Sequence, residues 1–142
     1  EGMHVVRERV DLPIMADESI WTPHDAMHCI RHQAVDVFNV YVSEAGGLGS
    51  AARIFAIAEA ARLPCIIGSM PELGIGTAAQ AHLAFAMPNL GYASDVNGCV
   101  YHSGDVINEK LPIEDGYMLL PSGPGLGVSL DEAALDEYRI DR

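Results

Sequence analysis

Short apolar runs alternate with helix-forming stretches along most of the chain. The apolar runs lie at residues 12–19, 35–43, 64–69 and 91–96. The helical patterns between them lie at residues 22–33, 49–63 and 76–87. Consecutive strands that are joined by helices form a parallel sheet. An α/β fold is therefore expected, and both an open doubly wound sheet and a closed barrel satisfy the alternation.

Particular residues mark the expected helix ends. Thr22 followed by Pro23 is typical of an N-cap and a first helical position. A short final helix is predicted over SLDEAALDEYR, with Ser129 as its cap and Glu132 in the capping-box position. Residues 97–127, by contrast, are rich in glycine and proline and predict irregular structure with one extended piece at GYMLLP.

The strand predicted at residues 35–43 has two unlike faces. Read at period 2, one face carries Asn39, Tyr41 and Ser43. The opposite face consists of Phe38, Val40 and Val42. A strand buried in a parallel sheet is usually apolar on both sides. In a barrel, however, the polar face would point into the interior, near the end where substrates bind, while the apolar face packs against helices.

Polar residues also stand at the ends of the other predicted strands. Asp17, Ser69 and Asp95 lie at or next to the ends of their apolar runs, as Ser43 does. Because the carboxyl ends of parallel strands share one edge of the sheet, a binding or catalytic site is expected at this edge in either fold.

Composition limits the kinds of partner. The 142 residues include 20 acidic and 8 basic side chains, and the net charge of −12 disfavours nucleic acid and anionic membranes. No apolar run approaches about 18 residues, and the start EGMHVVRERV has no signal-peptide core. Cys29, Cys65 and Cys99 are odd in number and show no CxxC spacing. We therefore expect reduced thiols and a cytoplasmic protein.

Four segments together resemble the C-terminal half of the barrel domain in the enolase superfamily. They are PIMADES, FNVYVSEAGGLG, GSMPELGIGTAAQAHLA and GPGLGVSLDEAALDEY, in the order and spacing of that family. The closest resemblance is to its muconate-lactonizing-enzyme subgroup, which groups mandelate racemase with muconate cycloisomerase. Members of this family combine a capping domain with a TIM-like (β/α)7β barrel.

The resemblance implies how the chain is organised. Residues 1–142 would carry barrel strands five to eight, and residues 97–142 would return towards the capping domain. The capping domain and the first half of the barrel would lie outside this chain. The full-length enzyme is expected to be a homo-oligomer that binds a small carboxylate substrate.

The resemblance also implies a divalent cation, Mg²⁺ or Mn²⁺, which stabilises the enolate formed when a proton α to a carboxylate is removed. Asp17 in MADES matches the third of three carboxylate ligands of this cation, and Glu18 matches the acidic residue beside it. Carboxylate oxygens suit such a hard cation and offset its charge. The other two ligands, and a lysine motif on the second strand of the family's barrel, would lie upstream.

Further site residues follow from the same resemblance. Glu72 in SMPELGIG matches a glutamate that faces the site in several members of the family. Ser69 and Met70 would flank it and shape the substrate pocket. Other positions expected to contact substrate are Asn39, Ser43 and Asp95.

Tyr41 departs from the family pattern. Its position in FNVYVSEAGG matches a catalytic lysine of the subgroup, and the only lysine of this chain is Lys110, in the irregular C-terminal segment. A tyrosine with a pKa of about 10 is roughly one-thousandth ionised at pH 7, so a tyrosine base would need a lowered pKa. A neutral phenol can act without a shift as a proton donor or as a hydrogen-bond donor to an enolate. A tyrosine that only lines the barrel is the third alternative.

Two other patterns look like sites but have simpler interpretations. His24, His28 and His32 form a stripe on one side of a predicted helix whose opposite side is apolar, so the stripe is expected to face solvent. The sequence GGLGS before a helix resembles a phosphate-binding loop, but it lacks the GxGxxG spacing and a P-loop lysine. We expect it to be a βα loop.

Three functions are compatible with these features. The leading one is a metal-dependent isomerase that removes the α-proton of a small carboxylate, as a cycloisomerase, racemase or epimerase. A dehydratase of the same superfamily, in which hydroxide leaves after proton removal, is the second. The third is a non-catalytic α/β module, or a fragment that is inactive by itself.

Overall fold

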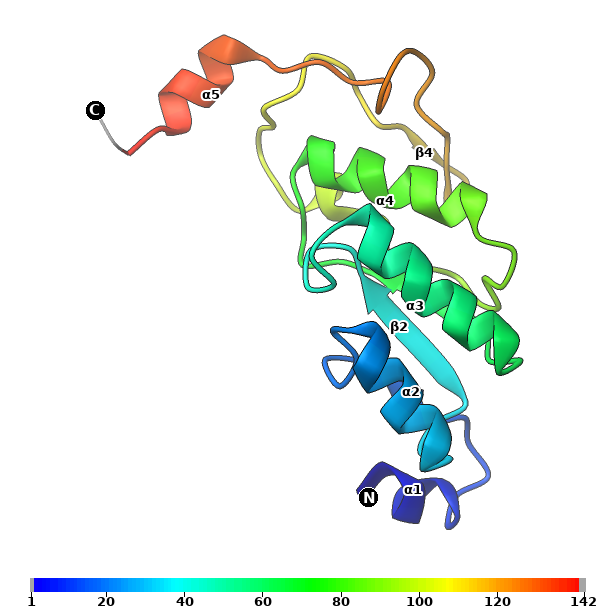
Figure 1. Ribbon diagram of the computed structural model, residues 1–142. Coiled ribbons are helices and arrows are strands. Elements are labelled where there is room, and N and C mark those ends of the chain that lie inside the picture. The colour runs from blue at the N-terminus through cyan, green and yellow to red at the C-terminus, as the bar shows by residue number, and fades with distance from the viewer. Residues whose placement is uncertain (1, 141–142) are drawn as a thin grey trace.

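Three parallel strands and the helices that follow them form the centre of the molecule (Figure 1). The computed structural model describes residues 2–140. One sheet contains, in this order, β1 (Met15–Ala16), β2 (Val37–Tyr41) and β3 (Cys65–Gly68). They are followed in turn by α2 (Pro23–Arg31), α3 (Leu48–Ala60) and α4 (Gly74–Ala86). The predicted alternation of parallel strands and helices is confirmed.

The register of the sheet places the ends of the strands at one edge. Ala16 of β1 pairs with Phe38 of β2, and Tyr41 at the end of β2 pairs with Gly68 at the end of β3. Residues that directly follow the three strands therefore lie close together in space, although they are far apart in the sequence.

The predicted fourth strand at residues 91–96 does not form. Its backbone runs beside β3, where the amide of Asp95 donates to the carbonyl of Ile67 over 2.8 Å. The amide of Ile67, however, donates to the side-chain hydroxyl of Ser94 (3.0 Å) rather than to a backbone carbonyl. This side-chain bond interrupts the ladder, so only an isolated bridge to β3 is left. The first predicted strand, at residues 12–19, is likewise shorter than expected.

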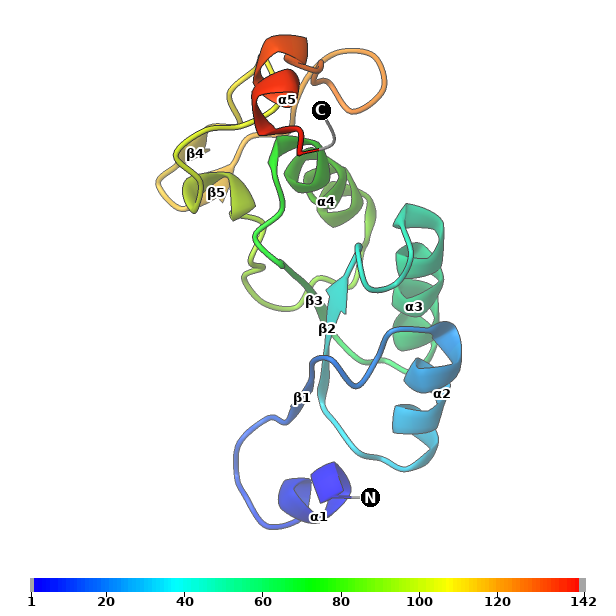
Figure 2. The same ribbon diagram turned by 90° about the vertical axis from the view of Figure 1, so that its left-hand side faces the viewer.

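Helices α2 and α3 lie side by side on one side of the strands (Figures 1 and 2). The apolar face of β2, including Phe38 and Val40, packs in the same core as Ile54 and Phe55 of α3, and all four side chains are fully buried. The prediction that this face of β2 packs against helices is confirmed. Asn39 and Tyr41 consequently lie on the opposite face of the strand.

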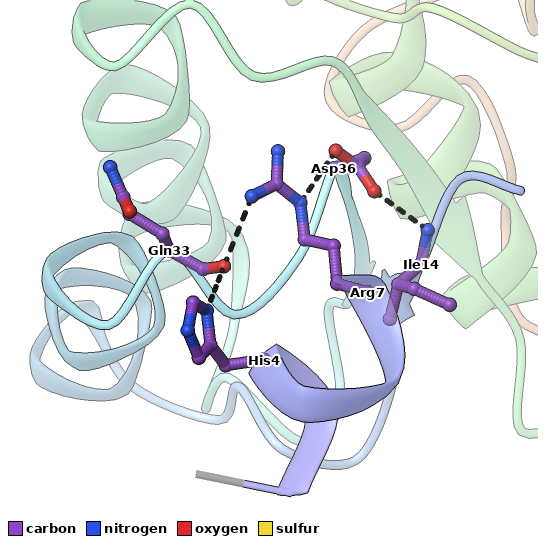
Figure 3. A network of polar contacts seen from close by, with 5 residues as sticks. All are labelled: His4, Arg7, Ile14, Gln33 and Asp36. Atoms are coloured by element: carbon purple, nitrogen blue, oxygen red, sulfur yellow. Dashed lines mark hydrogen bonds and ion pairs between the residues drawn. The ribbon is translucent and has the colours of Figure 1, made fainter. Parts of the chain in front are cut away.

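Helix α1 (Gly2–Arg7) is fixed to the loop that precedes β2 (Figure 3). The guanidinium of Arg7 donates to Asp36 Oδ1 over 2.8 Å and to the carbonyl of Gln33 over 3.2 Å. The other carboxylate oxygen of Asp36 accepts from the amide of Ile14 (2.9 Å), just before β1. Asp36 thus holds α1 and the chain that enters β1 in one place.

The capping prediction for α2 is confirmed. Thr22 Oγ1 accepts from the amide of Asp25 (3.2 Å), and the Asp25 carboxylate accepts from the amide of Thr22 (2.9 Å). These reciprocal bonds form a capping box, with Pro23 at the first helical position.

The capping prediction for the last helix, α5 (Glu132–Tyr138), is wrong. Its N-cap is Asp131, whose carboxylate accepts from the amides of Ala133 and Ala134, each over 3.0 Å. Ser129 is engaged elsewhere, because its amide and hydroxyl donate to the Glu109 carboxylate, at 2.7 Å each, and its hydroxyl oxygen accepts from the Asn108 side-chain amide over 3.1 Å.

The segment between α4 and α5 is largely irregular, as the sequence predicts. It contains only η1 (Gly98–Val100) and a small hairpin of β4 (Ile113–Glu114) and β5 (Tyr117–Met118), which confirms part of the extended piece at GYMLLP. A second small core packs this segment on α4 through Ala78, Ile107 and Leu111. Over residues 2–140 no helix has the length and apolar character needed to cross a membrane. All three cysteines are free thiols.

Candidate active site

Two hydrogen-bond networks meet at the carboxyl ends of the three parallel strands. The first joins the end of β1 to β2 through Asp17, Asn39 and Tyr41. The second joins the loops after β2 and β3 through Ser43, Ser69 and Glu72. Six of the nine residues predicted from the sequence thus lie in two neighbouring clusters at the predicted edge.

Asn39 is the centre of the first network. Its side-chain amide donates to Asp17 Oδ1 over 3.0 Å and to the Tyr41 hydroxyl oxygen over 3.3 Å. Asn39 is 5% exposed, and its own Oδ1 is buried without a hydrogen-bond partner among the described residues. The amide therefore fixes the orientation of one Asp17 oxygen and of the phenol.

Gly68 makes room for this network, and sequence reasoning missed it. A Cβ atom at Gly68 would lie 2.6 Å from both Asn39 Oδ1 and Tyr41 Cζ, closer than any side chain can approach. Because Gly68 pairs directly with Tyr41 across the sheet, only glycine lets the phenol lie over β3. A glycine at the end of an otherwise apolar strand was the available signal.

The surroundings of Tyr41 favour its neutral form. Burial raises the pKa of the Tyr41 hydroxyl well above its ordinary value of 10.0, and a hydrogen bond with Asp17 and the charges of Asp17, Glu18 and Glu44 raise it further. A tyrosine base would need the opposite shift. Among the roles left open by the sequence, the described surroundings therefore favour a hydrogen-bond or proton donor.

Glu72 is held in place by donors on both sides. Its Oε2 accepts from Ser69 Oγ (2.6 Å) and from the amide of Met70 (3.1 Å), and its Oε1 accepts from Ser43 Oγ (3.2 Å). Burial alone would raise the pKa of Glu72, but hydrogen bonds from Ser69, from its own amide, from the Met70 amide and from Gln80 lower it below its ordinary value. Glu72 is therefore an ionised carboxylate that ties the loop after β2 to the loop after β3.

Glu44 is a further acidic residue that the sequence analysis missed. Its Oε2 is buried and has no hydrogen-bond partner among the described residues. Burial raises the pKa of Glu44, and the nearby charges of Glu18, Asp17 and Glu72 add to this increase. Counted at period 2, Glu44 would belong to the apolar face of β2 together with Phe38, Val40 and Val42, so the sequence pattern gave no reason to place it in the site. The strand ends at Tyr41, however, so this alternation no longer applies at Glu44.

Three of the predicted residues lie outside the two networks. Glu18 is exposed and acts on Tyr41 and Glu44 through its charge. Met70 contributes its backbone amide to Glu72, while its side chain is 53% exposed. Asp95 is exposed beside β3, and its backbone amide is bonded to the sheet.

The histidine stripe and the GGLGS loop agree with their simpler interpretations. His24 and His28 of α2 and His32 at its C-cap are all exposed, as expected. In GGLGS, the φ angles of Gly46 and Gly47 are +81° and +113°, values that favour glycine in the turn that leads into α3.

A comparison with known families identifies this arrangement. The family model described as "Enolase C-terminal domain-like" matches residues 1–134. The chain belongs to the enolase superfamily. Within it, the relatives place the chain in the muconate-lactonizing-enzyme subgroup, as the four sequence segments predicted.

The similar proteins of this superfamily include several isomerases. Muconate cycloisomerase 1 of Rhodococcus opacus is 40% identical over 129 residues, which cover 91% of this chain and 35% of the relative. L-Ala-D/L-Glu epimerase of Bacillus subtilis is 35% identical over 127 residues, which cover 89% of this chain and 34% of the relative. The chain thus spans about a third of the length of these curated relatives.

Solved structures decide between the two α/β folds that the sequence left open. The crystal structure of 2-chloromuconate cycloisomerase from Rhodococcus opacus 1CP superposes with a TM-score of 0.95 at 37% identity. The match covers 99% of this chain and 38% of that one. The chain is therefore α/β and forms part of a TIM barrel, not an open doubly wound sheet.

The donor set of this enolase-superfamily chain fits part of a divalent-cation site. A buried carboxylate oxygen without a partner, as on Glu44, is costly among other carboxylates unless a cation offsets the charge. Oxygen ligands of this kind suit Mg²⁺ or Mn²⁺. Within residues 2–140, however, no three His, Cys, Asp or Glu side chains are arranged to hold a metal ion together. The described carboxylates thus fit an incomplete ligand set.

Proposed function

We propose that the protein is a metal-dependent isomerase that removes the α-proton of a small carboxylate substrate, as a cycloisomerase, racemase or epimerase. The observation that supports this most directly is the Asn39 amide, which joins Asp17 to Tyr41 at the carboxyl ends of the barrel strands. Residues 1–142 would supply the part of the barrel that the resemblance assigns to strands five to eight, of which β1, β2 and β3 form within residues 2–140, and with it one half of the active site. A capping domain and the other barrel strands would complete it.

In this proposal Asp17 is a ligand of Mg²⁺ or Mn²⁺, and Glu18 and Glu44 add negative charge next to it. When bound, the cation would offset the negative charge that develops on the substrate carboxylate as the α-proton leaves. Asn39 would keep Asp17 correctly oriented for this role, because it fixes one of the two carboxylate oxygens. The remaining ligands would come from upstream strands.

Tyr41 would act as a neutral donor. Its oxygen accepts from the Asn39 amide, and its proton, which a hydrogen bond shares with Asp17, would turn to the negative charge that forms on the substrate. Removal of the α-proton would then be the task of a base outside this chain, such as the lysine expected upstream. The raised pKa of Tyr41 supports this division of roles.

Glu72 would form the wall of the substrate pocket. Its ionised carboxylate, held by Ser43 and Ser69, would place a fixed negative charge at the carboxyl ends of β2 and β3. Asn39, Met70 and Asp95 are proposed to contact the substrate from the surrounding positions. Because these carboxylates would repel a substrate carboxylate, we expect a hydrogen-bond donor or a cation to lie between the substrate and this half of the site.

A dehydratase of the same superfamily is the alternative. The neutral phenol of Tyr41 is compatible with this reaction as well, because an acid on this face could protonate a departing hydroxide. A non-catalytic module is the remaining candidate, and the same experiment addresses it.

The test uses the full-length protein with Mg²⁺ in deuterated water. Muconate and the L-Ala-L-Glu dipeptide are suitable probes, since the relatives carry these substrates in their names. An isomerase is expected to introduce deuterium at the α-carbon. Apart from this exchange, its product should have the same mass as the substrate. Loss of one water from the product identifies a dehydratase. If neither probe, nor a panel of other small carboxylates, exchanges hydrogen or forms product, the proposal is wrong.

A further inference from the structure

The C-terminal irregular segment contacts the loop that carries Glu72 at several consecutive positions. This loop, residues 69–73, connects β3 to α4. The contacts come from residues 98–105, which follow α4 in the sequence and return to the start of the same helix. None of these contacts involves the Glu72 carboxylate itself, which is held by Ser43, Ser69 and the Met70 amide.

The first contact is made by Asp105 at the start of α4. The N-cap of α4 is Leu73, which has no side chain able to accept a hydrogen bond. Instead, both carboxylate oxygens of Asp105 accept from the amide of Gly74, each over 2.9 Å. A Cβ at Gly74 would lie 2.8 Å from Asp105 Oδ2 and even closer to Ile107. A residue 31 positions away in the sequence thus caps this helix.

His102 makes the second contact. Its Nε2 lies 2.7 Å from the carbonyl oxygen of Pro71, the residue before Glu72. A carbonyl can only accept, so Nε2 carries the proton and donates. Gly98 makes the third contact, with Glu72, the residue after Pro71. It packs so closely that an added Cβ would lie 2.3 Å from the backbone oxygen of Glu72. The loop is therefore fixed at residues 71, 72 and 74 by one segment.

Helix α4 itself also holds the loop. The hydroxyl of Thr77, which is fully buried, donates to the backbone oxygen of Glu72 over 2.9 Å. Helix α4 and the returning segment thus both contact the backbone of Glu72, since a Cβ at Gly98 would also lie 3.0 Å from Thr77 Oγ1. The direction of its side chain is then set by Ser43, Ser69 and the Met70 amide.

We propose that His102 and Asp105 are positioning residues for Glu72. They touch neither the proposed substrate site nor its carboxylates, and they act by holding the backbone on which Glu72 stands. This inference rests on the proposed function for its catalytic consequence only, since the loop geometry is independent of the reaction. Displacement of a site residue by about 1 Å can reduce turnover by as much as ~100-fold.

The first experiment measures amide hydrogen exchange over residues 69–76 in the full-length protein. His102→Ala is expected to accelerate exchange in this peptide by ~5-fold, the effect of losing one net hydrogen bond. His102→Gln restores a donor and should recover most of the protection. The matched control is His82→Ala, because His82 Nε2 also donates to a backbone carbonyl, that of Leu126, over 3.0 Å. Equal exchange rates for His102→Ala and the wild type would overturn the inference.

Asp105 is tested in the same way with two variants. Asp105→Ala removes the cap of α4, while Asp105→Asn keeps one acceptor for Gly74 and should retain part of the protection. Glu109→Ala is the control, because Glu109 lies in the same segment and binds Ser129 rather than the loop. If Glu109→Ala accelerates exchange at residues 69–76 as much as Asp105→Ala does, the effect belongs to the whole segment and the inference is wrong.

The second experiment is a double-mutant cycle on turnover. His102→Ala is expected to lower kcat by ~10-fold in the wild-type background and to have no further effect in a Glu72→Gln background. A purely structural role would lower kcat by the same factor in both. If the wild-type protein shows neither α-hydrogen exchange nor turnover, the proposed function fails, while the amide-exchange result still decides this inference.

Discussion

The side-chain amide of Asn39 donates a hydrogen bond of 3.0 Å to Asp17 Oδ1. Asn39 lies within β2 and Asp17 directly follows β1, so this bond joins neighbouring strands at the edge where their carboxyl ends meet. The same amide also reaches Tyr41, and this links the expected metal ligand to the residue expected to stand where the family has a lysine. The positions of Asp17 and Tyr41 are therefore coupled through one buried side chain.

Tyr41→Phe should reduce turnover of the full-length enzyme by roughly 10²–10⁴-fold. The substitution keeps the ring that lies over Gly68 and removes only the hydroxyl, so the melting temperature should change little. Turnover and α-hydrogen exchange in deuterated water are the two measurements. Tyr101→Phe is a suitable control, since Tyr101 is 65% exposed.

The two measurements on Tyr41→Phe also separate its roles. Loss of both exchange and turnover indicates that the phenol stabilises the negative charge formed when the α-proton leaves, or takes that proton. Retained exchange with lost product indicates that Tyr41 is the acid of a later step. Wild-type turnover would show that Tyr41 only lines the barrel.

Glu44→Gln should stabilise the metal-free protein near pH 7. Burial and the charges of Glu18, Asp17 and Glu72 raise the pKa of Glu44 above its ordinary value of 4.5. The protonated form is thus favoured in the folded state, and its contribution to stability is complete below about pH 4.5 and lost as the pH rises through the raised value. The glutamine variant does not ionise and avoids this loss.

Thermal unfolding in EDTA tests this prediction. Near pH 7 the melting temperature of Glu44→Gln should exceed that of the wild type by a few degrees, and the difference should vanish below about pH 4.5. Glu59→Gln, on the exposed side of α3, is the control for the change of charge. Added Mg²⁺ should reduce the advantage of the variant. An equal or lower melting temperature near neutral pH would contradict the raised pKa.

The two serines that hold Glu72 should differ in importance. Ser69 donates over 2.6 Å and Ser43 over 3.2 Å, so Ser69→Ala should cost about 1–2 kcal/mol of unfolding free energy and Ser43→Ala less than half of that. Glu72 has a lowered pKa in the folded state, so its contribution to stability is fully present above its ordinary value of 4.5 and is lost only as the pH falls through the lowered folded-state value. Chemical denaturation should therefore show a cost of Ser69→Ala at about pH 7 that is still largely present just below pH 4.5 and that shrinks at more acidic pH. Equal costs for the two serines would refute this ranking.

The parts of the fold that depend on local patterns could be predicted from the sequence. The strand–helix alternation and the capping box of Thr22 follow from side-chain period and from residues three positions apart. The polar face of β2 also predicted that Asn39 and Tyr41 have hydrogen-bond partners, because a buried strand rarely carries such residues without a partner.

The parts that failed depend on contacts between distant segments. Ser129 has the right type and spacing for a cap, but Glu109 binds it from 20 residues away, and Asp131 takes its place. Ser94 likewise breaks the expected last strand by accepting from the backbone of Ile67, a contact across 27 residues. No local pattern records such competition for hydrogen bonds.

The 142-residue chain by itself should bind Mg²⁺ weakly. Asp17 is proposed as one ligand of a set whose other members are expected upstream, and over residues 2–140 no three metal-binding side chains gather. A single carboxylate with nearby charges attracts a divalent cation without replacing enough of its water. Calorimetric titration of the isolated chain with MgCl₂ checks this prediction. Micromolar affinity for Mg²⁺ would contradict the proposal that this chain holds half of a barrel site.

The same chain should also self-associate or fold poorly when it is isolated. Within residues 2–140 β1 pairs only with β2, and the far edge of β3 is covered by the irregular backbone near Ser94 rather than by a strand. Open strand edges pair readily with other copies, and an incomplete barrel leaves interior side chains without neighbours. Light scattering after size-exclusion chromatography should therefore detect dimers or larger species, and thermal unfolding should be broad. A monomer with a sharp, cooperative transition would show instead that these 142 residues form an independent domain.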